Sequence, residues 1–214
     1  MTLRKHALVG LALMGLLPLT TSLSACSSIL PGDHGAVMQG EGHDMHTMDL
    51  GPADANYDLR FIDAMIVHHE GAIIMAEAAL ANSERAEIRQ LAEEIIAAQK
   101  VEIAQMQAWR QAWYPDAPAQ PVMYHAEMNH DMPMSEEMAA GMRMDVDLGA
   151  ADGEFDLRFI NAMIPHHEGA LVMAEDLKAK SDRPEMQTLA GEIITAQQGE
   201  IDQMLAWRQA WYSQ

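Results

Sequence analysis

Two adjacent histidines followed by a glutamate occur twice in this chain, each time inside an apolar run. The segment FIDAMIVHHEGAIIMAE begins at Phe61, and FINAMIPHHEGALVMAE begins 98 residues later at Phe159. Imidazole is a common metal ligand, and a buried imidazole needs a partner of some kind. Two equivalent pairs of imidazoles in one molecule therefore indicate metal binding. The alternative is a buried hydrogen bond between histidine and glutamate that only fixes how the helices pack.

The histidine segments belong to a longer internal repeat. It runs without a gap from Asp58 to Tyr114 and again from Asp156 to Tyr212, and about two-thirds of the aligned residues are identical. Runs rich in Ala, Glu, Ile and Leu favour helices. Polar breaks near residues 82–83 and 180–182 divide each repeat into two helices. Repeat one (57–114) and repeat two (155–212) are therefore each predicted to be a helical hairpin.

The two hairpins and the segment between them predict the fold class. A hairpin alone leaves an apolar stripe exposed, so the two hairpins should pack together in one bundle. Residues 115–152 are long for a connection within a compact domain, which is typical of bundles with a long crossover. We therefore predict an all-α protein, a ferritin-like four-helix bundle over residues 54–214. It would consist of two duplicated helical hairpins joined by a Met-rich crossover.

Polar residues interrupt the predicted buried seam of the second helix in each hairpin. In the first repeat, Gln99 and Glu102 stand in a heptad pattern of otherwise apolar residues, and Met65 and His69 occupy the seam of the preceding helix. A turn at residues 82–83 places His69 opposite Gln99, and Met65 opposite Glu102. A buried histidine and a buried glutamate cost several kcal/mol unless they are paired or bind a metal.

The candidate metal ligands in the bundle are the paired histidines and nearby Met and Glu residues. His69 and His167 should point into the bundle, whereas His68 and His166 lie beside the seam and should face the crossover. The predicted ligands are His68, His69, Met65, Met75, Glu102 and Met106 in repeat one, and His166, His167, Met163, Met173, Glu200 and Met204 in repeat two. The residues predicted to support them by hydrogen bonds are Gln99, Gln197, Glu70 and Glu168. Pro165 should kink its helix, so the two sites need not match.

The crossover contains seven methionines and two histidines between residues 123 and 144. Methionine at helical spacing is usually core filler, but neighbours such as Asn129 and Asp131 cannot build a core, and exposed thioethers are open to oxidation. Thioether and imidazole together suit Cu(I) and, by the same softness, Ag(I), whereas Cu(II) also accepts carboxylate. The residues predicted to bind such an ion here are Met128, His130, Met132 and Met134.

The N-terminal residues predict a location in the bacterial cell envelope, facing the periplasm or the exterior. Arg4 and Lys5 precede an apolar run that ends in Leu-Ser-Ala-Cys at Cys26. This is the layout of a secretory signal, and its end resembles a bacterial lipobox. We expect residues 1–26 to be a lipoprotein signal peptide with Cys26 lipidated, and residues 27–53 to be a flexible tether. The alternative is a plain secreted protein.

Charge and cysteine content limit the classes of partner that the chain is expected to bind. The chain has 32 acidic and 13 basic residues, a formal net charge of −19, which repels nucleic acid and attracts cations. Solubility alone explains this charge equally well. Cys26 is the only cysteine, so soft-metal chemistry elsewhere must use thioether and imidazole. The lipid is the only membrane contact that we expect.

With these residues identified, the chain resembles the bacterial family called domain of unknown function 305. Helices of that family read like FI-x-x-MI-P-HHEGA-x-x-MA and LA-x-x-I-x-x-x-Q-x-x-EI-x-x-M-x-x-W. The first pattern occurs at Phe61–Ala76 and Phe159–Ala174, and the second at Leu91–Trp109 and Leu189–Trp207. Val67 departs from the proline of the motif. The resemblance implies a ferritin-like bundle with an extracytoplasmic copper-binding role in copper resistance and with Met and His ligands.

The leading hypothesis is a copper-binding protein, not an enzyme, that sequesters or transfers Cu(I). Its partners would be metal ions, copper donor or acceptor proteins, and a second copy of the chain in a homodimer. One alternative is a ferritin-like di-metal oxidase, but such sites use Glu-x-x-His pairs and several bridging carboxylates, and neither histidine-bearing helix has that spacing. The other alternative is a purely structural bundle on the cell surface.

Overall fold

The computed structural model describes residues 49–214. The predicted signal peptide, the lipidation of Cys26 and the predicted tether up to residue 48 lie outside them. The described elements are α1 (Tyr57–Asn82), α2 (Ala86–Trp113), β1 (Val122–His125), β2 (His130–Pro133), α3 (Glu136–Arg143), α4 (Phe155–Lys180) and α5 (Pro184–Tyr212). The predicted helical fold is confirmed, and the crossover is more ordered than expected because it contains a β hairpin and a short helix. Likeness to ferritin stays a prediction.

Both helical hairpins turn through a connection of three residues, close to the predicted breaks. Ser83 and Ser181 have extended backbone, which ends the preceding helix. Each serine hydroxyl accepts a hydrogen bond from the backbone N–H two residues further on. The shared local sequence, Ser-x-Arg, therefore builds the same turn twice.

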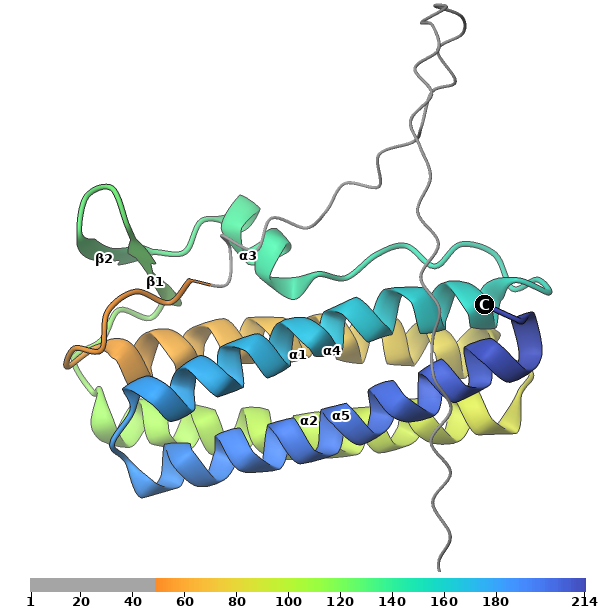
Figure 1. Cartoon of the computed structure of the whole chain (residues 1–214). Coiled ribbons are helices and arrows are strands. Elements are labelled where there is room, and N and C mark those ends of the chain that lie inside the picture. Colours follow the sequence, from red (N-terminus) through yellow and green to blue (C-terminus); the bar gives the residue numbers. More distant parts are fainter. Residues whose placement is uncertain (1–48) are drawn as a thin grey trace, which may run out of the picture. The chain divides into compact units, whose positions relative to one another are not determined.

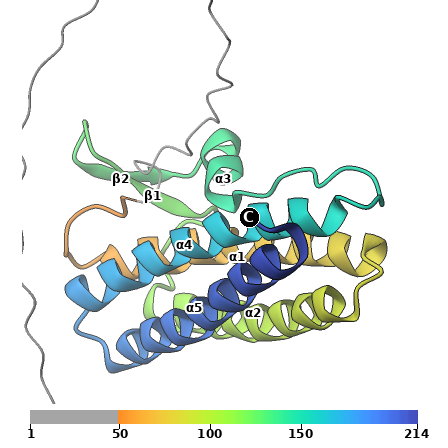
Figure 2. The same cartoon turned by 45° about the vertical axis from the view of Figure 1, so that its right-hand side comes forward.

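The four long helices lie in two layers (Figure 1). α1 and α4 are antiparallel neighbours in one layer, while α2 packs on α1 and α5 packs on α4 from the other layer. The β hairpin and α3 lie over the outer face of the α1–α4 layer and rest on α1 (Figure 2). α1, covered on both sides, buries 16 of its 26 residues, whereas α2 buries six of 28. Among residues 49–214, α1 alone is long and apolar enough to span a membrane, and its central place in the bundle accounts for that composition.

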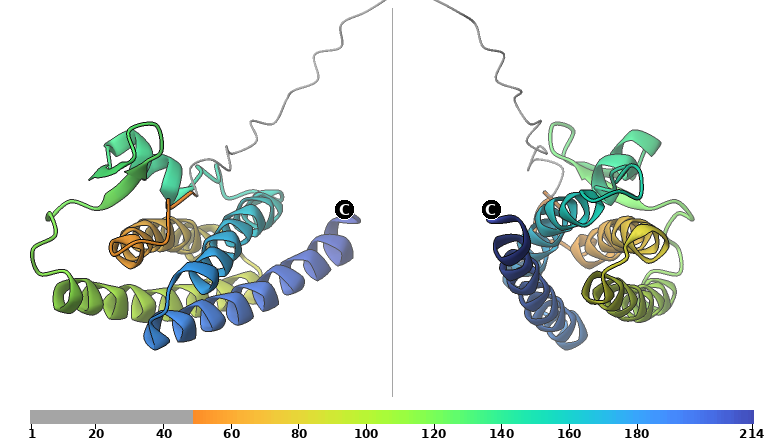
Figure 3. Two further views of the ribbon diagram at one scale, coloured as in Figure 1. Left: turned by 60° about the vertical axis from the view of Figure 1, so that its left-hand side comes forward. Right: turned by 90° about the vertical axis from the view of Figure 1, so that its right-hand side faces the viewer.

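The core divides into two hydrophobic clusters at opposite ends of the α1–α4 pair. The first cluster joins the N-terminal half of α1 to the C-terminal half of α4 and the start of α5. The second joins the remaining halves of α1 and α4 to the start of α2 and the end of α5. Figure 3 shows along the helices how α2 and α5 flank this central pair. The paired histidines occupy the middle of α1 and α4, between the two clusters.

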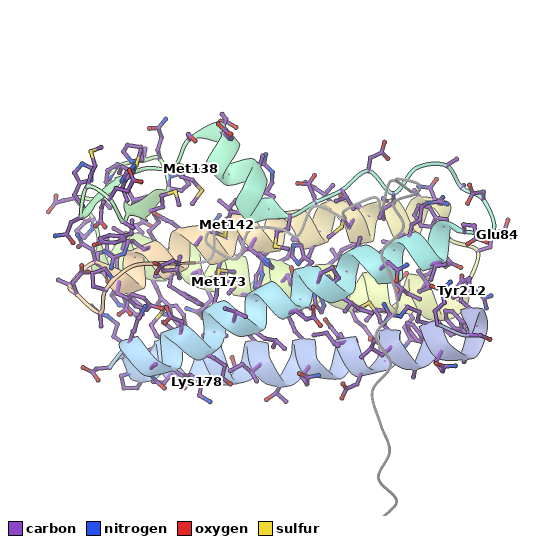
Figure 4. All side chains as sticks on the ribbon, turned by 45° about the horizontal axis from the view of Figure 1, so that its top comes forward. Glu84, Met138, Met142, Met173, Lys178 and Tyr212 are labelled. Atoms are coloured by element: carbon purple, nitrogen blue, oxygen red, sulfur yellow. The ribbon has the colours of Figure 1, made fainter. Side chains whose placement is uncertain are left out.

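The turn of each hairpin contacts the far end of the other hairpin. Arg85 forms an ion pair with Asp156 at 3.2 Å, and its guanidinium lies 4.3 Å from the centre of the Trp211 ring. Figure 4 shows this end of the bundle, where Glu84 and Tyr212 are labelled. The equivalent contacts at the other end join Arg183 to Asp58 (3.0 Å) and to Trp113 (4.4 Å).

Residues 49–53, which we assigned to the tether, are part of the folded bundle. Leu50 is buried in the first cluster, and Arg60 Nε donates a hydrogen bond to its carbonyl oxygen at 2.7 Å. Arg158 Nε binds the carbonyl of Leu148 in the same way at 2.6 Å. The repeat therefore begins at the Asp-Leu-Gly sequences of residues 49–51 and 147–149. The predicted boundary at residue 54 left out the first arm because such Gly-containing arms carry no helical pattern, although an arginine side chain holds each of them.

Candidate metal centre

The four paired histidines form one buried row across the centre of the α1–α4 layer. In the order His69, His68, His166 and His167, their ring centroids are 6.5, 3.8 and 6.1 Å apart, and no ring is more than 1% exposed. Because α1 and α4 are antiparallel, their histidine pairs meet where the two helices cross. The duplication therefore builds one continuous row rather than two separate places.

Each end of the row is hydrogen-bonded to a glutamate of the neighbouring helix. His69 Nε2 donates to Glu102 Oε2 at 2.6 Å, and His167 Nε2 donates to Glu200 Oε2 at 2.5 Å. Glu102 and Glu200, which the sequence placed among the metal ligands, are thus hydrogen-bond partners of the end histidines. Each carboxylate holds the ring proton on Nε2, so Nδ1 keeps its lone pair, and both Nδ1 atoms are buried without a hydrogen-bond partner. Carboxylates orient metal-binding histidines in this way.

The contact between His69 and Glu102 differs from the predicted register by about one helical turn, since His69 was expected opposite Gln99. The connection between α1 and α2 is centred on residue 84, not between residues 82 and 83. In addition, Cα–Cβ bonds tilt toward the N-terminus of a helix, so His69 leans away from the turn and Glu102 leans toward it. Met65, expected opposite Glu102, shares the first hydrophobic cluster with Met106.

The two central histidines have different surroundings. His166 Nε2 donates to the backbone carbonyls of His68 (3.1 Å) and Arg143 (3.0 Å), whereas neither ring nitrogen of His68 has a partner. Burial, together with the neighbouring imidazoles, lowers the pKa of His166 to about 3 and the pKa of His68 well below its usual value. Both rings are therefore neutral near pH 7, which is the form that binds metals.

Gly71 allows the crossover to reach this row. A Cβ atom at Gly71 would overlap the carbonyl oxygen of Arg143, the last residue of α3. Met144, which follows, has a left-handed φ of 50° and ends that helix. The glycine of the His-His-Glu-Gly sequence thus admits the carbonyl that accepts the His166 proton. His166 faces the crossover, as predicted.

Unpartnered nitrogen atoms are concentrated in the row. Burying a polar atom without a hydrogen bond costs about 1–3 kcal/mol, and a metal ion that takes up the lone pairs would remove this cost. Gln99 and Gln197, one helical turn before the glutamates, also bury a side-chain oxygen without a partner. The unpartnered ring atoms are Nδ1 and Nε2 of His68 and Nδ1 of His69, His166 and His167.

The donors present favour a metal that accepts sulfur. Within residues 49–214, no three His, Cys, Asp or Glu side chains lie close enough together to hold one ion. This part of the chain therefore gives no support to a carboxylate-bridged pair of metal ions, and an ion in the row would need thioether ligands as well. All the predicted thioether ligands of the bundle are buried: Met65, Met75, Met106, Met163, Met173 and Met204.

Glu70 and Glu168 do not behave as predicted. Both side chains are exposed on the surface of the bundle, and neither forms a hydrogen bond with any side chain that the structure describes. The glutamate that follows each histidine pair points away from the row because consecutive helical residues lie about 100° apart around the helix axis. Support for the histidines comes from Glu102 and Glu200 instead.

A cavity between α2 and α5 lies beside Glu102, at one end of the row. It has a volume of about 320 Å³, and Glu102, Glu185 and Glu192 are among its lining residues. Glu102 therefore contacts both His69 and the cavity. Carboxylates that line a cavity raise the local concentration of cations, so this cavity would attract a metal ion to the side of Glu102.

The four crossover residues predicted to bind a soft metal do not share one surface. Met128 lies at the turn of the β hairpin and is 61% exposed, whereas Met134 is 7% exposed in the first cluster. His130 and Met132 lie between them on one face of β2. Figure 4 shows Met138 and Met142 on α3, and Met142 reaches the same cluster as Met134.

Sequence reasoning did not include Met123 and His125 among the candidate ligands. They lie on β1, directly across the hairpin from Met132 and His130. The alternation of Met and His at residues 123 and 125 and at residues 130 and 132 is the signal that could have found them, because alternate residues of a strand share a face.

Fold and site define a duplicated helical-hairpin protein with a buried row of imidazoles at its centre. The chain belongs to the family Domain of unknown function (DUF305), which matches residues 58–208. The resemblance seen in the sequence is thereby confirmed.

Solved structures of other proteins share this fold. CopM in the Cu(I)-bound form is 39% identical with a TM-score of 0.57, and CopM in the Cu(II)-bound form is 41% identical with a TM-score of 0.58. Each match covers 72% of this chain and 97% of CopM. A DUF305 fragment from Deinococcus radiodurans is 29% identical with a TM-score of 0.54, over 73% of this chain and 97% of the fragment.

A curated relative matches a shorter segment. It is "Uncharacterized protein L153" of Acanthamoeba polyphaga mimivirus, 39% identical over 49 residues, which are 23% of this chain. The matching segment spans about a third (32%) of that protein's length.

Proposed function

We propose that this protein binds copper, preferentially as Cu(I), through methionine and histidine ligands, and that it sequesters the ion or transfers it to a partner. The observation that carries the proposal is the buried row of four imidazoles. Glu102 and Glu200 fix the end rings so that their Nδ1 lone pairs are available. Buried methionines lie in the hydrophobic clusters on both sides of the row, and thioether with imidazole is the donor set of Cu(I) and Ag(I).

The relatives support copper, with silver as its soft analogue. CopM has been solved in Cu(I)-bound, Cu(II)-bound and Ag-bound forms, and this chain matches nearly its whole length. In this proposal the histidine row retains the ion inside the bundle, and the acidic cavity beside Glu102 attracts it. No chemical step beyond binding and release is required.

The proposed place of action is the bacterial cell envelope. The apolar run that ends in Leu-Ser-Ala-Cys supports export and lipidation of Cys26. The net charge of −19 supports attraction of cations. Anchoring at the outer side of a membrane would place the metal site where copper enters the envelope.

The experiment is a Cu(I) titration of the chain from residue 27 onward against a chromophoric chelator, under a reductant. We expect this protein to retain Cu(I) against the chelator. A variant with His68, His69, His166 and His167 all replaced by Leu should lose the bundle-bound ions while staying folded. Replacing buried polar groups with apolar side chains of similar shape has little effect on stability.

Glu70→Gln/Glu168→Gln is the matched control, because these carboxylates adjoin the histidine pairs but are exposed. It should bind as much Cu(I) as the parent. Failure of the parent to retain Cu(I) would sink the proposal, and so would unchanged binding by the four-leucine variant. Binding of iron with consumption of oxygen would favour the di-metal oxidase instead.

A further inference from the structure

We infer that the β hairpin of the crossover carries a second soft-metal site, formed by Met123, His125, His130 and Met132. The inference deepens the proposed function and rests on it, because it names a copper site outside the histidine row. We call these four residues the hairpin tetrad. The tetrad contains two thioethers and two imidazoles, the same donors as the bundle, but it lies at the surface.

The strand register brings the four side chains together. Met123 pairs with Met132, and His125 pairs with His130. Residues two apart on a strand point to the same face, so both pairs share one face of the hairpin. Directly opposed Cβ atoms lie about 5 Å apart, and neighbouring pairs lie about 7 Å apart along the strands. The two imidazole centroids are 6.3 Å apart with the rings nearly perpendicular.

The opposite face of the hairpin is fixed to the bundle. Arg60 Nη1 donates to Asp131 Oδ1 at 2.8 Å, and the Arg60 guanidinium lies 5.3 Å from the centre of the Tyr124 ring. Asn56 Nδ2 also donates to Asp131, at 2.8 Å. The Tyr124 ring packs so closely on Gly51 that a Cβ atom there would overlap it. These contacts hold the hairpin from one side, while on the tetrad face Met123 packs partly against the first hydrophobic cluster.

The composition of the tetrad selects a soft, monovalent ion. Asp131, the carboxylate of β2, is on the other face and engaged by Arg60, so the tetrad offers no hard oxygen ligand. His130 is exposed and the other three residues are half-buried, which leaves the donors accessible to an ion from solvent. Thioether and imidazole ligands without carboxylate suit Cu(I) and Ag(I) better than Zn(II) or Ca(II).

The two histidines are not equally ready to bind. His125 Nδ1 accepts a long hydrogen bond, 3.2 Å, from the backbone N–H of Met128, so a metal at His125 must break this bond. The His130 side chain forms no hydrogen bond with any residue that the structure describes. Met123, Met132 and His130 are therefore the first three ligands, and His125 completes the site as the fourth.

The test uses the chain from residue 27 onward, which retains every residue that the structure describes. Its methionine methyl groups are labelled with carbon-13, and NMR spectra are recorded as Ag(I) is added, since Ag(I) is diamagnetic and takes the same donors. We expect the methyl signals of Met123 and Met132 to shift. The Met123→Leu/Met132→Leu variant should lose one equivalent of Cu(I) in the chelator titration.

Met138→Leu/Met142→Leu is the matched control, with two methionines of the same crossover that lie on α3, off the β hairpin. It should keep the full number of equivalents, and Met→Leu changes conserve volume well enough to keep the fold. If Met123→Leu/Met132→Leu also keeps every equivalent while the four-leucine histidine variant loses its ions, the tetrad is refuted and the proposed function stands. If the parent protein binds neither Cu(I) nor Ag(I), both the tetrad site and the proposed function are refuted.

Discussion

The two repeats follow one plan but have different surroundings. Their shared parts are almost superimposable in geometry: the His–Glu distances are 2.6 and 2.5 Å, and the arginine contacts that hold the two arms are 2.7 and 2.6 Å. The differences arise where the crossover packs on α1. Arg60 is 1% exposed and also binds Asp131 of the β hairpin, whereas the equivalent Arg158 is 35% exposed.

Asp63 and its counterpart Asn161 show the same contrast. Asp63 is buried and accepts hydrogen bonds from Arg110 and from the backbone N–H of Val122 at the start of β1. Asn161 is exposed and accepts a hydrogen bond from Arg208 at 3.2 Å. Duplication therefore supplies the symmetric histidine row, while the single crossover can cover only one copy and makes the two copies unequal.

The largest expected effect is the difference between Arg60→Leu and Arg158→Leu. Removing Arg60 leaves two backbone carbonyls without their donor and leaves the partly buried Asp131 with Asn56 alone as a partner, so we expect the free energy of unfolding to fall by about 3–5 kcal/mol. Removing Arg158, which is partly exposed, should lower it by about 1 kcal/mol. Urea unfolding measures both, and equal losses would contradict the asymmetry.

Gly71→Ala should separate the crossover from the row. The added Cβ overlaps the Arg143 carbonyl, and relieving the overlap should lower the free energy of unfolding by about 1–3 kcal/mol. Gly199→Ala is the control, because no atom lies within 4 Å of its added Cβ, and alanine favours helix by up to about 1 kcal/mol. Thermal unfolding measures both variants. Equal stability of Gly71→Ala and Gly199→Ala would contradict the close packing of Gly71 on the Arg143 carbonyl.

Glu102→Gln and Glu200→Gln test whether the two ends of the row are equivalent. Each change removes the charge that holds the imidazole proton on Nε2, and loss of such a partner usually weakens metal affinity about 10–100-fold. Because the two geometries match, we expect equal weakening in the Cu(I) chelator titration. An effect at only one end would show that the asymmetry extends to the row.

The last prediction concerns the pH dependence of the metal-free protein. Unfolding exposes imidazoles whose pKa is about 6.5, whereas burial holds the pKa of His166 at about 3 and lowers that of His68. Below pH 6.5 the unfolded state binds more protons, so stability is complete above pH 6.5 and falls as the pH falls toward 3, by up to about 1.4 kcal/mol per pH unit for each histidine. In urea unfolding between pH 5 and 7.5, the free energy of unfolding should depend less steeply on pH in His68→Leu/His166→Leu than in the parent. An equal dependence on pH would contradict the lowered pKa values of these histidines.

The sequence predicted the helices and placed His69 within about one helical turn of Glu102, because both depend on local periodicity and on a short turn. It did not predict that the two histidine pairs meet, since this depends on α1 and α4 crossing at their midpoints, which no local pattern encodes. The arm at residue 50 was missed because its stability comes from one arginine ten residues away. The burial of Met134 was missed because its polar neighbours stand on a strand, where alternate residues face opposite ways.

The contacts of the two hairpin turns have a consequence for shorter chains. Arg85 in the turn of the first hairpin contacts the far end of the second hairpin, and Arg183 in the turn of the second contacts the far end of the first. Each hairpin therefore depends on the other for these ion pairs and cation–π contacts. A chain with a single repeat could make the same contacts only with a second chain, around a two-fold axis between the helices equivalent to α1 and α4. In this protein the crossover links the two hairpins covalently, which gives each hairpin an effective concentration around the other in about the millimolar range. The pair of hairpins therefore does not dissociate on dilution.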